Sequence, residues 1–141
     1  MPFLLENKIG RLVEISLHNV LAVEDMTALR NRLWTLLSQV EGRAAIWVDA
    51  REIELFSSEV ATTLIHMFRV DNPKVERSAY LFNGRASLAL QVDRVINEAK
   101  GVGRVPPRRT FREPRAAGDW IKEALTEPAE RQRVDDLIRS G

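Results

Sequence analysis

The chain of 141 residues contains no cysteine, which excludes a disulfide framework, a thiolate nucleophile and a cysteine metal site. It also lacks a long apolar run: the longest, from Ala44 to Val48, has five residues, whereas a membrane-spanning helix needs about 18 or more. The residues from Met1 to Glu6 lack the basic start and the long apolar middle of a signal peptide. We therefore expect a soluble, cytoplasmic protein without membrane insertion.

An excess of charge of one sign is also missing. The 21 Lys and Arg residues nearly balance 20 Asp and Glu residues, so the net charge of +1 does not indicate a nucleic-acid partner. The exception is a segment with five arginines in twelve residues: Arg104, Arg108, Arg109, Arg112 and Arg115. If this segment forms an anion-binding site, we expect the ligands of the anion to be Arg108, Arg109 and Arg112. Because Arg outnumbers Lys 17 to 4 in the whole chain, a solvated surface segment is the favoured interpretation.

Groups for catalysis are scarce. The two histidines, His18 and His66, have no further ligands at the spacing of a metal site, and each has a structural explanation on its strand or helix. Gly101 and Gly103 resemble the start of a dinucleotide loop, but they follow a helix rather than a strand. We therefore expect a protein that is not an enzyme and that has neither a metal nor another cofactor.

Apolar residues are sufficient for one core. Leu, Ile, Val and Phe number 42, about 30% of the chain, which is above the roughly 20% below which chains stay unfolded. Alternation of polar and apolar residues, or short apolar runs, predict strands at 3–6, 13–17, 44–48, 79–82 and 109–111. Apolar residues at helical spacing predict helices over about 24–40, from Ser57 or Ser58 to 71, over 86–99, from Pro114 to 125, and from Pro128 with Thr126 as its cap.

Strands that alternate with helices predict an α/β protein with a mixed sheet of about four to five strands and helical cover. The strand 44–48 has no polar alternation, so we place it at the centre of the sheet with both faces covered. We expect one domain over residues 1–126 and a helical extension over 127–141. The extension has only three large apolar residues after Ala129, which fits docking on its own chain or across the interface of a homo-oligomer.

Acidic residues gather between the strand 44–48 and the helix that follows it, at Asp49, Glu52, Glu54 and Glu59. In an open α/β sheet this is the usual place of a site, and such residues could bind a cation or act as paired acids. Against this, the loop is expected to be exposed, and Glu59 in the first turn of a helix is explained by the helix dipole. We therefore predict no metal site here.

The order of these elements resembles STAS domains, the SpoIIAA-like family of anti-sigma factor antagonists. The resemblance rests on the strand that ends at Asp49, the segment 53–56, the helix start at 57–60, and the closing segment 110–121. It covers about residues 1–126 and is strongest for the divergent branch shared with Sec14-type lipid-binding domains. It implies a SpoIIAA-like layer fold and a regulatory role of the bacterial signalling type.

The phospho-acceptor of that family is replaced in this chain. Family members that act as phosphorylation switches carry Asp-Ser-Ser/Thr-Gly at this helix start, and the third position accepts phosphate. Here the four positions are Ser57, Ser58, Glu59 and Val60. Glu59 has a fixed negative charge and no hydroxyl, so we expect the phosphorylation switch to be absent. Ser57 and Ser58 are explained as helix caps.

Two functions remain open. The first is a regulatory module that binds a partner protein through Asp49, Ser57, Ser58 and Glu59. The second is a carrier of a small apolar ligand or lipid, in which Trp47, Phe56, Phe68 or Trp120 would line a cavity; aromatic residues at such positions are more often part of a filled core. We favour the first, because the apolar stripes of the three main helices are about wide enough to seal one sheet.

Overall fold

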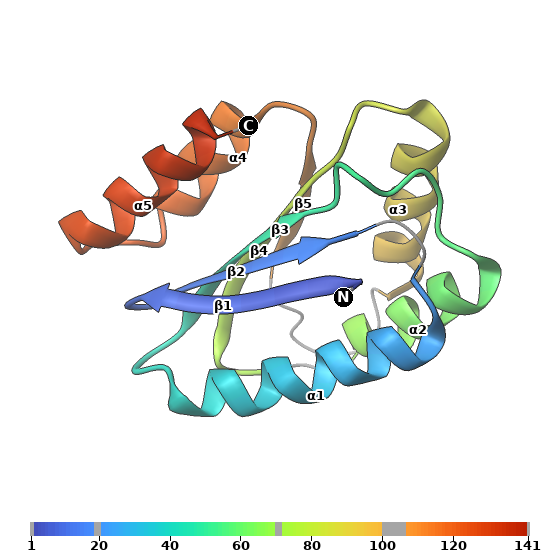
Figure 1. The fold of residues 1–141 in the computed structure, drawn as a ribbon, viewed down its shortest axis with the longest axis horizontal. Coiled ribbons are helices and arrows are strands. Elements are labelled where there is room, and N and C mark those ends of the chain that lie inside the picture. Colours follow the sequence, from blue (N-terminus) through green and yellow to red (C-terminus); the bar gives the residue numbers. More distant parts are fainter. Residues whose placement is uncertain (1, 19–20, 70–71, 100–106, 141) are drawn as a thin grey trace.

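The computed structural model describes residues 2–18, 21–69, 72–99 and 107–140. Within them the chain forms five strands and five helices, in the alternating order expected from the sequence (Figure 1). The elements are β1 (Phe3–Ile9), β2 (Leu12–Leu17), α1 (Val23–Gln39), β3 (Ala44–Asp49), α2 (Ser58–Arg69), β4 (Val75–Leu81), α3 (Ala86–Ala99), β5 (Arg108–Phe111), α4 (Pro114–Lys122) and α5 (Pro128–Arg139). None of these helices has both the length and the apolar character needed to cross a membrane.

The five strands form one mixed sheet in the order of the sequence, β1-β2-β3-β4-β5. The hairpin β1–β2 is antiparallel, and all other neighbours are parallel. β3 lies at the centre, and its residues from Ala44 to Val48 are buried. The short, arginine-containing β5 is an edge strand. The α/β class, the mixed sheet, the central strand and the charged edge strand are confirmed.

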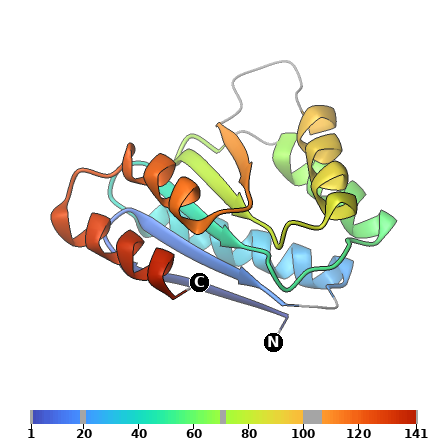
Figure 2. The ribbon, with the colours of Figure 1, turned by 90° about the horizontal axis from the view of Figure 1, so that it is seen from above.

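Helices cover both faces of the sheet, as Figures 1 and 2 show. Ile46 and Val48 of β3 belong to the apolar cluster that includes α1, α2 and α3. Ala45 and Trp47, which alternate with them, belong to a second cluster with α4 and α5. An uninterrupted apolar strand therefore serves two cores at once, and this is why β3 shows no polar alternation.

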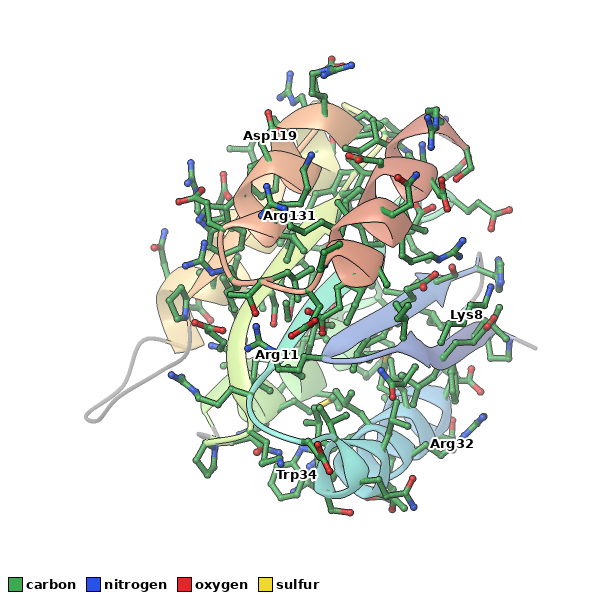
Figure 3. The ribbon with its side chains drawn as sticks, turned by 90° about the vertical axis from the view of Figure 1, so that its left-hand side faces the viewer. Lys8, Arg11, Arg32, Trp34, Asp119 and Arg131 are labelled. Carbon is green, nitrogen blue, oxygen red and sulfur yellow. The ribbon has the colours of Figure 1, made fainter. Side chains whose placement is uncertain are left out.

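The helix α5 docks on its own chain. Its buried Glu130 accepts a hydrogen bond from the backbone nitrogen of Arg11 in the β1–β2 turn (2.6 Å), and Val134 is fully buried. The guanidinium of Arg11 in turn donates to the carbonyl of Ala124, between α4 and α5 (2.5 Å). Figure 3 shows Arg11 at the tip of the hairpin, below the two C-terminal helices. The sequence is compatible with docking of this helix on its own chain or across the interface of a homo-oligomer. In this structure it docks on its own chain.

Glycine is needed where the hairpin meets α5. Gly10 has a φ of 51°, and a Cβ atom there would lie 2.2 Å from the carboxylate of Glu130. Any side chain at this turn would therefore be strained and would also displace the carboxylate. Gly118 of α4 leaves space for α5, because a Cβ atom there would lie 2.4 Å from Ile138.

Several boundaries differ from the prediction. β1 continues to Ile9 rather than ending at residue 6. β4 begins at Val75 rather than Ala79, because Arg77 fits into the strand by laying its guanidinium over the ring of Trp120 at 4.8 Å. α4 ends at Lys122 rather than 125. The cap of α5 is Glu127 rather than Thr126, and the Glu127 backbone nitrogen donates to Glu130. Gly101 and Gly103, which follow the helix predicted over 86–99, lie outside the described residues.

Candidate functional site

The start of α2, predicted as the partner-binding surface, is exposed and well anchored. Ser57 caps the helix, because its Oγ accepts a hydrogen bond from the backbone nitrogen of Val60 (3.2 Å). Ser58 and Glu59 follow in the first turn and are both exposed. The capping role assigned to Ser57 is confirmed, and two polar side chains remain at the surface beside it.

Two amide side chains hold the loop that leads into α2. Gln91 of α3 forms a pair of hydrogen bonds with the backbone of Phe56, at 2.9 Å to its nitrogen and 2.8 Å to its carbonyl oxygen. Asn83 donates to the carbonyls of Arg51 and Ile53. The buried side chains of Ile53 and Phe56 complete the attachment. The helix start is therefore positioned by fixed contacts on both sides.

Exposed apolar side chains lie next to these contacts. Leu55 is 58% exposed and directly precedes Phe56, whereas Leu90 is 71% exposed and directly precedes Gln91. Since Phe56 and Gln91 are hydrogen-bonded to each other, each leucine is one residue away in the chain from this contact. We call Leu55, Ser57, Ser58, Glu59 and Leu90 the α2 edge.

Asp49 does not belong to the α2 edge. It lies at the end of β3 on the sheet face that α5 covers, whereas α2 packs on the opposite face. Both carboxylate oxygens accept from the guanidinium of Arg51, at 3.0 and 2.8 Å. Burial alone would raise the pKa of Asp49, but the hydrogen bonds and the charge of Arg51 outweigh it and hold the pKa below its ordinary value of 3.8.

Asp49 instead lines a hollow of about 190 Å³ between the sheet and α5, which we call the sheet hollow. Trp47 lies in its wall, and Leu137 of α5 borders it. The charged residues around it are Glu6 and Lys8 of β1, Glu14 of β2, Asp49 of β3, Arg51 of the following loop and Arg133 of α5. These charges form three ion pairs, Lys8–Glu6 (3.2 Å), Arg133–Glu14 (2.8 Å) and Arg51–Asp49 (2.8 Å).

The sheet hollow is not predictable from the sequence pattern. In β1 and β2 the polar residues Glu6, Glu14 and Ser16 alternate with apolar ones, which is typical of a face open to solvent. The structure instead places these residues under α5, whose Arg133 is 119 residues away from Glu14 along the chain. The sequence gives only a weak indication of the hollow. Several charged residues lie on the polar side of strands that precede the central buried strand.

The predicted anion-binding arginines do not converge. Arg108 lies beside the hydroxyl of Tyr80, to which it is hydrogen-bonded. Arg109, one residue further along β5, points to the other face and lies over the rings of Phe111 and Trp120, at 5.4 and 5.5 Å. Arg112 follows the strand and is exposed. Arg104 lies outside the described residues.

The two histidines lie in different surroundings. His18 contacts the carboxylate of Glu52 at the surface, after the end of β2. His66 is exposed on α2 and borders a shallow hollow with Thr63 and Met67. In the described part of the chain, no three His, Asp or Glu side chains are grouped so that they could hold a metal ion.

The fold therefore defines a three-layer α/β protein with a mixed sheet in sequential order and with two surfaces of interest, the α2 edge and the sheet hollow. No protein-family model matches the chain, and no curated protein is significantly similar to it in sequence.

Proposed function

We propose that this protein is a non-catalytic regulatory module that binds a partner protein through the α2 edge. The observation that carries the proposal is the exposure of Leu55 and Leu90, each of which precedes in the chain one member of the hydrogen-bonded pair that fixes the helix start. Apolar side chains on an anchored backbone, with polar groups beside them, are suited to a protein interface, because little conformational entropy is lost on binding.

The resemblance to STAS domains supports the same surface. In that family the corresponding helix start is where phosphorylation acts, and here Ser57, Ser58 and Glu59 occupy it. Glu59 supplies a permanent negative charge in the first turn of α2. We therefore propose binding that does not depend on phosphorylation at this position.

The alternative, a carrier of an apolar ligand or lipid, has less support from the aromatic residues. Phe56 is buried within the apolar cluster of α1, α2 and α3. Trp120 is covered by the guanidinium groups of Arg77 and Arg109. Trp47 borders the sheet hollow, and charged residues line most of that hollow. The side chain of Phe68 lies outside the described residues.

The test is a quantitative affinity purification of the tagged protein from its native cells after cross-linking. Leu55→Ser and Leu90→Ser would reduce recovery of the specific partner several-fold. Trp34→Ser is the matched control, because Trp34 is an exposed apolar residue on α1, away from the α2 edge, and this variant would retain the partner. Equal recovery with all three variants would contradict the assignment of the surface.

Native mass spectrometry of the freshly purified protein separates the two functions. The interaction module would have the mass of the polypeptide alone or of a complex with a protein. A lipid or another apolar molecule in most of the purified protein would support the carrier instead. Stoichiometric phosphate on Ser57 or Ser58 would show that a phosphorylation switch is present but has moved along the helix start.

A further inference from the structure

The sheet face below α5 departs from the pattern of the rest of the protein. Where α4 covers this face, the strands present apolar residues such as Ala45, Ala79 and Leu81. Toward the sheet hollow, two rows of neighbouring residues cross β1, β2 and β3 on the same face. The first row is Glu6, Glu14 and Trp47, and the second is Leu4, Ser16 and Asp49.

Polar residues in these rows are costly for folding. Glu6 and Glu14 are direct neighbours on adjacent strands, and like charges in this position repel each other. The side chain of Glu14 is only 12% exposed, so its charge needs a partner, which Arg133 provides. A local departure from the rule of an apolar inner face, retained at a cost in stability, is typical of a functional site.

The position and size of the sheet hollow fit a small molecule. It lies at the carboxyl ends of the parallel strands β2 and β3, where open α/β sheets bind their ligands. Its volume of about 190 Å³ equals that of about six water molecules. Within the described part of the chain, the hydroxyl of Ser16, opposite Asp49 in the sheet, has no hydrogen-bond partner and is available to a ligand.

Charge balance indicates what kind of molecule would bind. Each cation of the hollow is paired with a carboxylate, so an anionic ligand that bound Arg51 would leave Asp49 without a partner. A cationic ligand that bound Asp49 would in the same way leave the guanidinium of Arg51 without a carboxylate partner. A ligand with both charges replaces both halves of the pair, and every charge stays compensated.

We propose that the sheet hollow is a binding site for a small zwitterion of the size of a free amino acid. The Asp49–Arg51 pair opens to receive it. The ligand carboxylate binds the guanidinium of Arg51, its ammonium group donates to Asp49, and Ser16 contributes a further hydrogen bond. The pair Arg133–Glu14, with the less exposed carboxylate, stays closed and keeps α5 in place.

Free amino acids are the probes for the test. The full-length protein is screened by thermal denaturation with glycine, L-alanine, L-serine, L-leucine and L-glutamine at millimolar concentration, and the ligand that raises Tm most is titrated by calorimetry. Its N-acetyl derivative has lost the positive charge, and its carboxamide has lost the negative charge. Each derivative would bind at least about tenfold more weakly. A panel in which no free amino acid raises Tm would overturn the proposal.

Two variants reverse the charge preference if the assignment of the pair is correct. Asp49→Asn leaves Arg51 without its carboxylate, so this variant would lose affinity for the zwitterion and bind the N-acetyl derivative better than the wild type does. Arg51→Gln would instead favour the carboxamide. Asp93→Asn, at an exposed position on α3, is the control and would behave as the wild type. A merely structural pair would give no reversal, and unchanged zwitterion binding in Asp49→Asn would also overturn the proposal.

This inference is independent of the proposed function. The α2 edge and the sheet hollow belong to opposite faces of the sheet. Loss of partner binding in the Leu90→Ser variant therefore tests the interaction module alone, and calorimetry with the Asp49→Asn variant tests the ligand site alone.

Discussion

Trp47 connects the two environments that meet on the α5-covered face of the sheet. It belongs to the apolar cluster with Ala117 and Ile121 of α4, and it also borders the charged sheet hollow. Its side chain is nevertheless almost completely covered, with 3% of the residue exposed. The indole ring thus separates the packed half of this face from the polar half.

Replacement of Trp47 by alanine would reduce the free energy of unfolding by about 3–5 kcal/mol, because a large buried aromatic side chain leaves a cavity in the core. The measurement is urea denaturation followed by circular dichroism. The control is Trp34→Ala on α1, where the ring is more than a third exposed and the loss would be much smaller. A loss below about 1 kcal/mol for Trp47→Ala would contradict its place in the core.

At the scale of residues, local roles were predictable and distant pairings were not. Ser57 was identified as a cap because the preference of serine for this position depends only on the adjacent backbone. The sequence predicts Asp49 at the surface of α2 because it is near Ser57 in the chain. The seven residues between them carry the chain to the other side of the sheet, and nothing local in the sequence shows this. Glu14 and Arg133 form a pair only because the complete fold brings them together.

Among the elements, α4 and α5 pack unusually closely. Gly118 lies on the face of α4 that meets α5, and the space of its missing side chain is filled by Ile138 and Val134. Arg131, labelled in Figure 3, lies on α5. It adds two hydrogen bonds to the carbonyls of Lys122 and Leu125. Close contact of the two helices therefore depends on a glycine at one position.

Gly118→Ala would destabilise the protein by about 1–3 kcal/mol, as overpacking does. At a solvent-exposed position inside a helix, the same change would stabilise the protein by up to about 1 kcal/mol. The sign of the change in unfolding free energy therefore shows whether Gly118 contacts α5. Denaturation by urea gives the free energy change. In a double-mutant cycle, Gly118→Ala would cost less in an Ile138→Ala background, because the clashing side chain is gone. Equal costs in both backgrounds would show that the helices do not meet at Gly118.

The elements themselves were more predictable than their ends. Periodicity identified five strands and five helices, since the core side of each element follows its own repeat. The start of β4 is not predictable because Glu76 and Arg77 interrupt the apolar run. Arg77 fits the strand only because α4 supplies the ring of Trp120 on which it stacks. The sequence predicts Thr126 as the cap of α5 because threonine is a commoner cap than glutamate, whereas the structure has Glu127 one residue later.

In the whole molecule, the C-terminal segment 127–141 completes the second core. Val134 and Glu130 are buried only because α5 lies on α4 and on the hairpin turn. Without this segment, part of the apolar cluster would be exposed and Glu14 would lose its partner Arg133. The division into a domain 1–126 and an extension thus has a direct test.

Deletion of residues 127–141 would lower the free energy of unfolding by at least about 3 kcal/mol, through the loss of buried apolar area and of the Glu14–Arg133 pair. Thermal denaturation and binding of a hydrophobic dye would report the loss and the exposed surface. The full-length Arg139→Ala variant is the control, since its partner Asp136 is also on α5 and both are at the surface. A shortened chain as stable as the full one would show that 1–126 is a complete domain.

The contacts between the hairpin and α5 also set the order of folding. Arg11 meets Glu130, and Glu14 meets Arg133, each across 119 residues of chain. Contacts of such high separation close the largest loops and form after nearer ones, such as the β1–β2 hairpin. We expect α5 to dock late and to detach before the central strands unfold, so its amide hydrogens would exchange with solvent sooner than those of β3. The sheet hollow would then lose the wall that α5 provides each time α5 detaches, while the rest of the sheet stays intact.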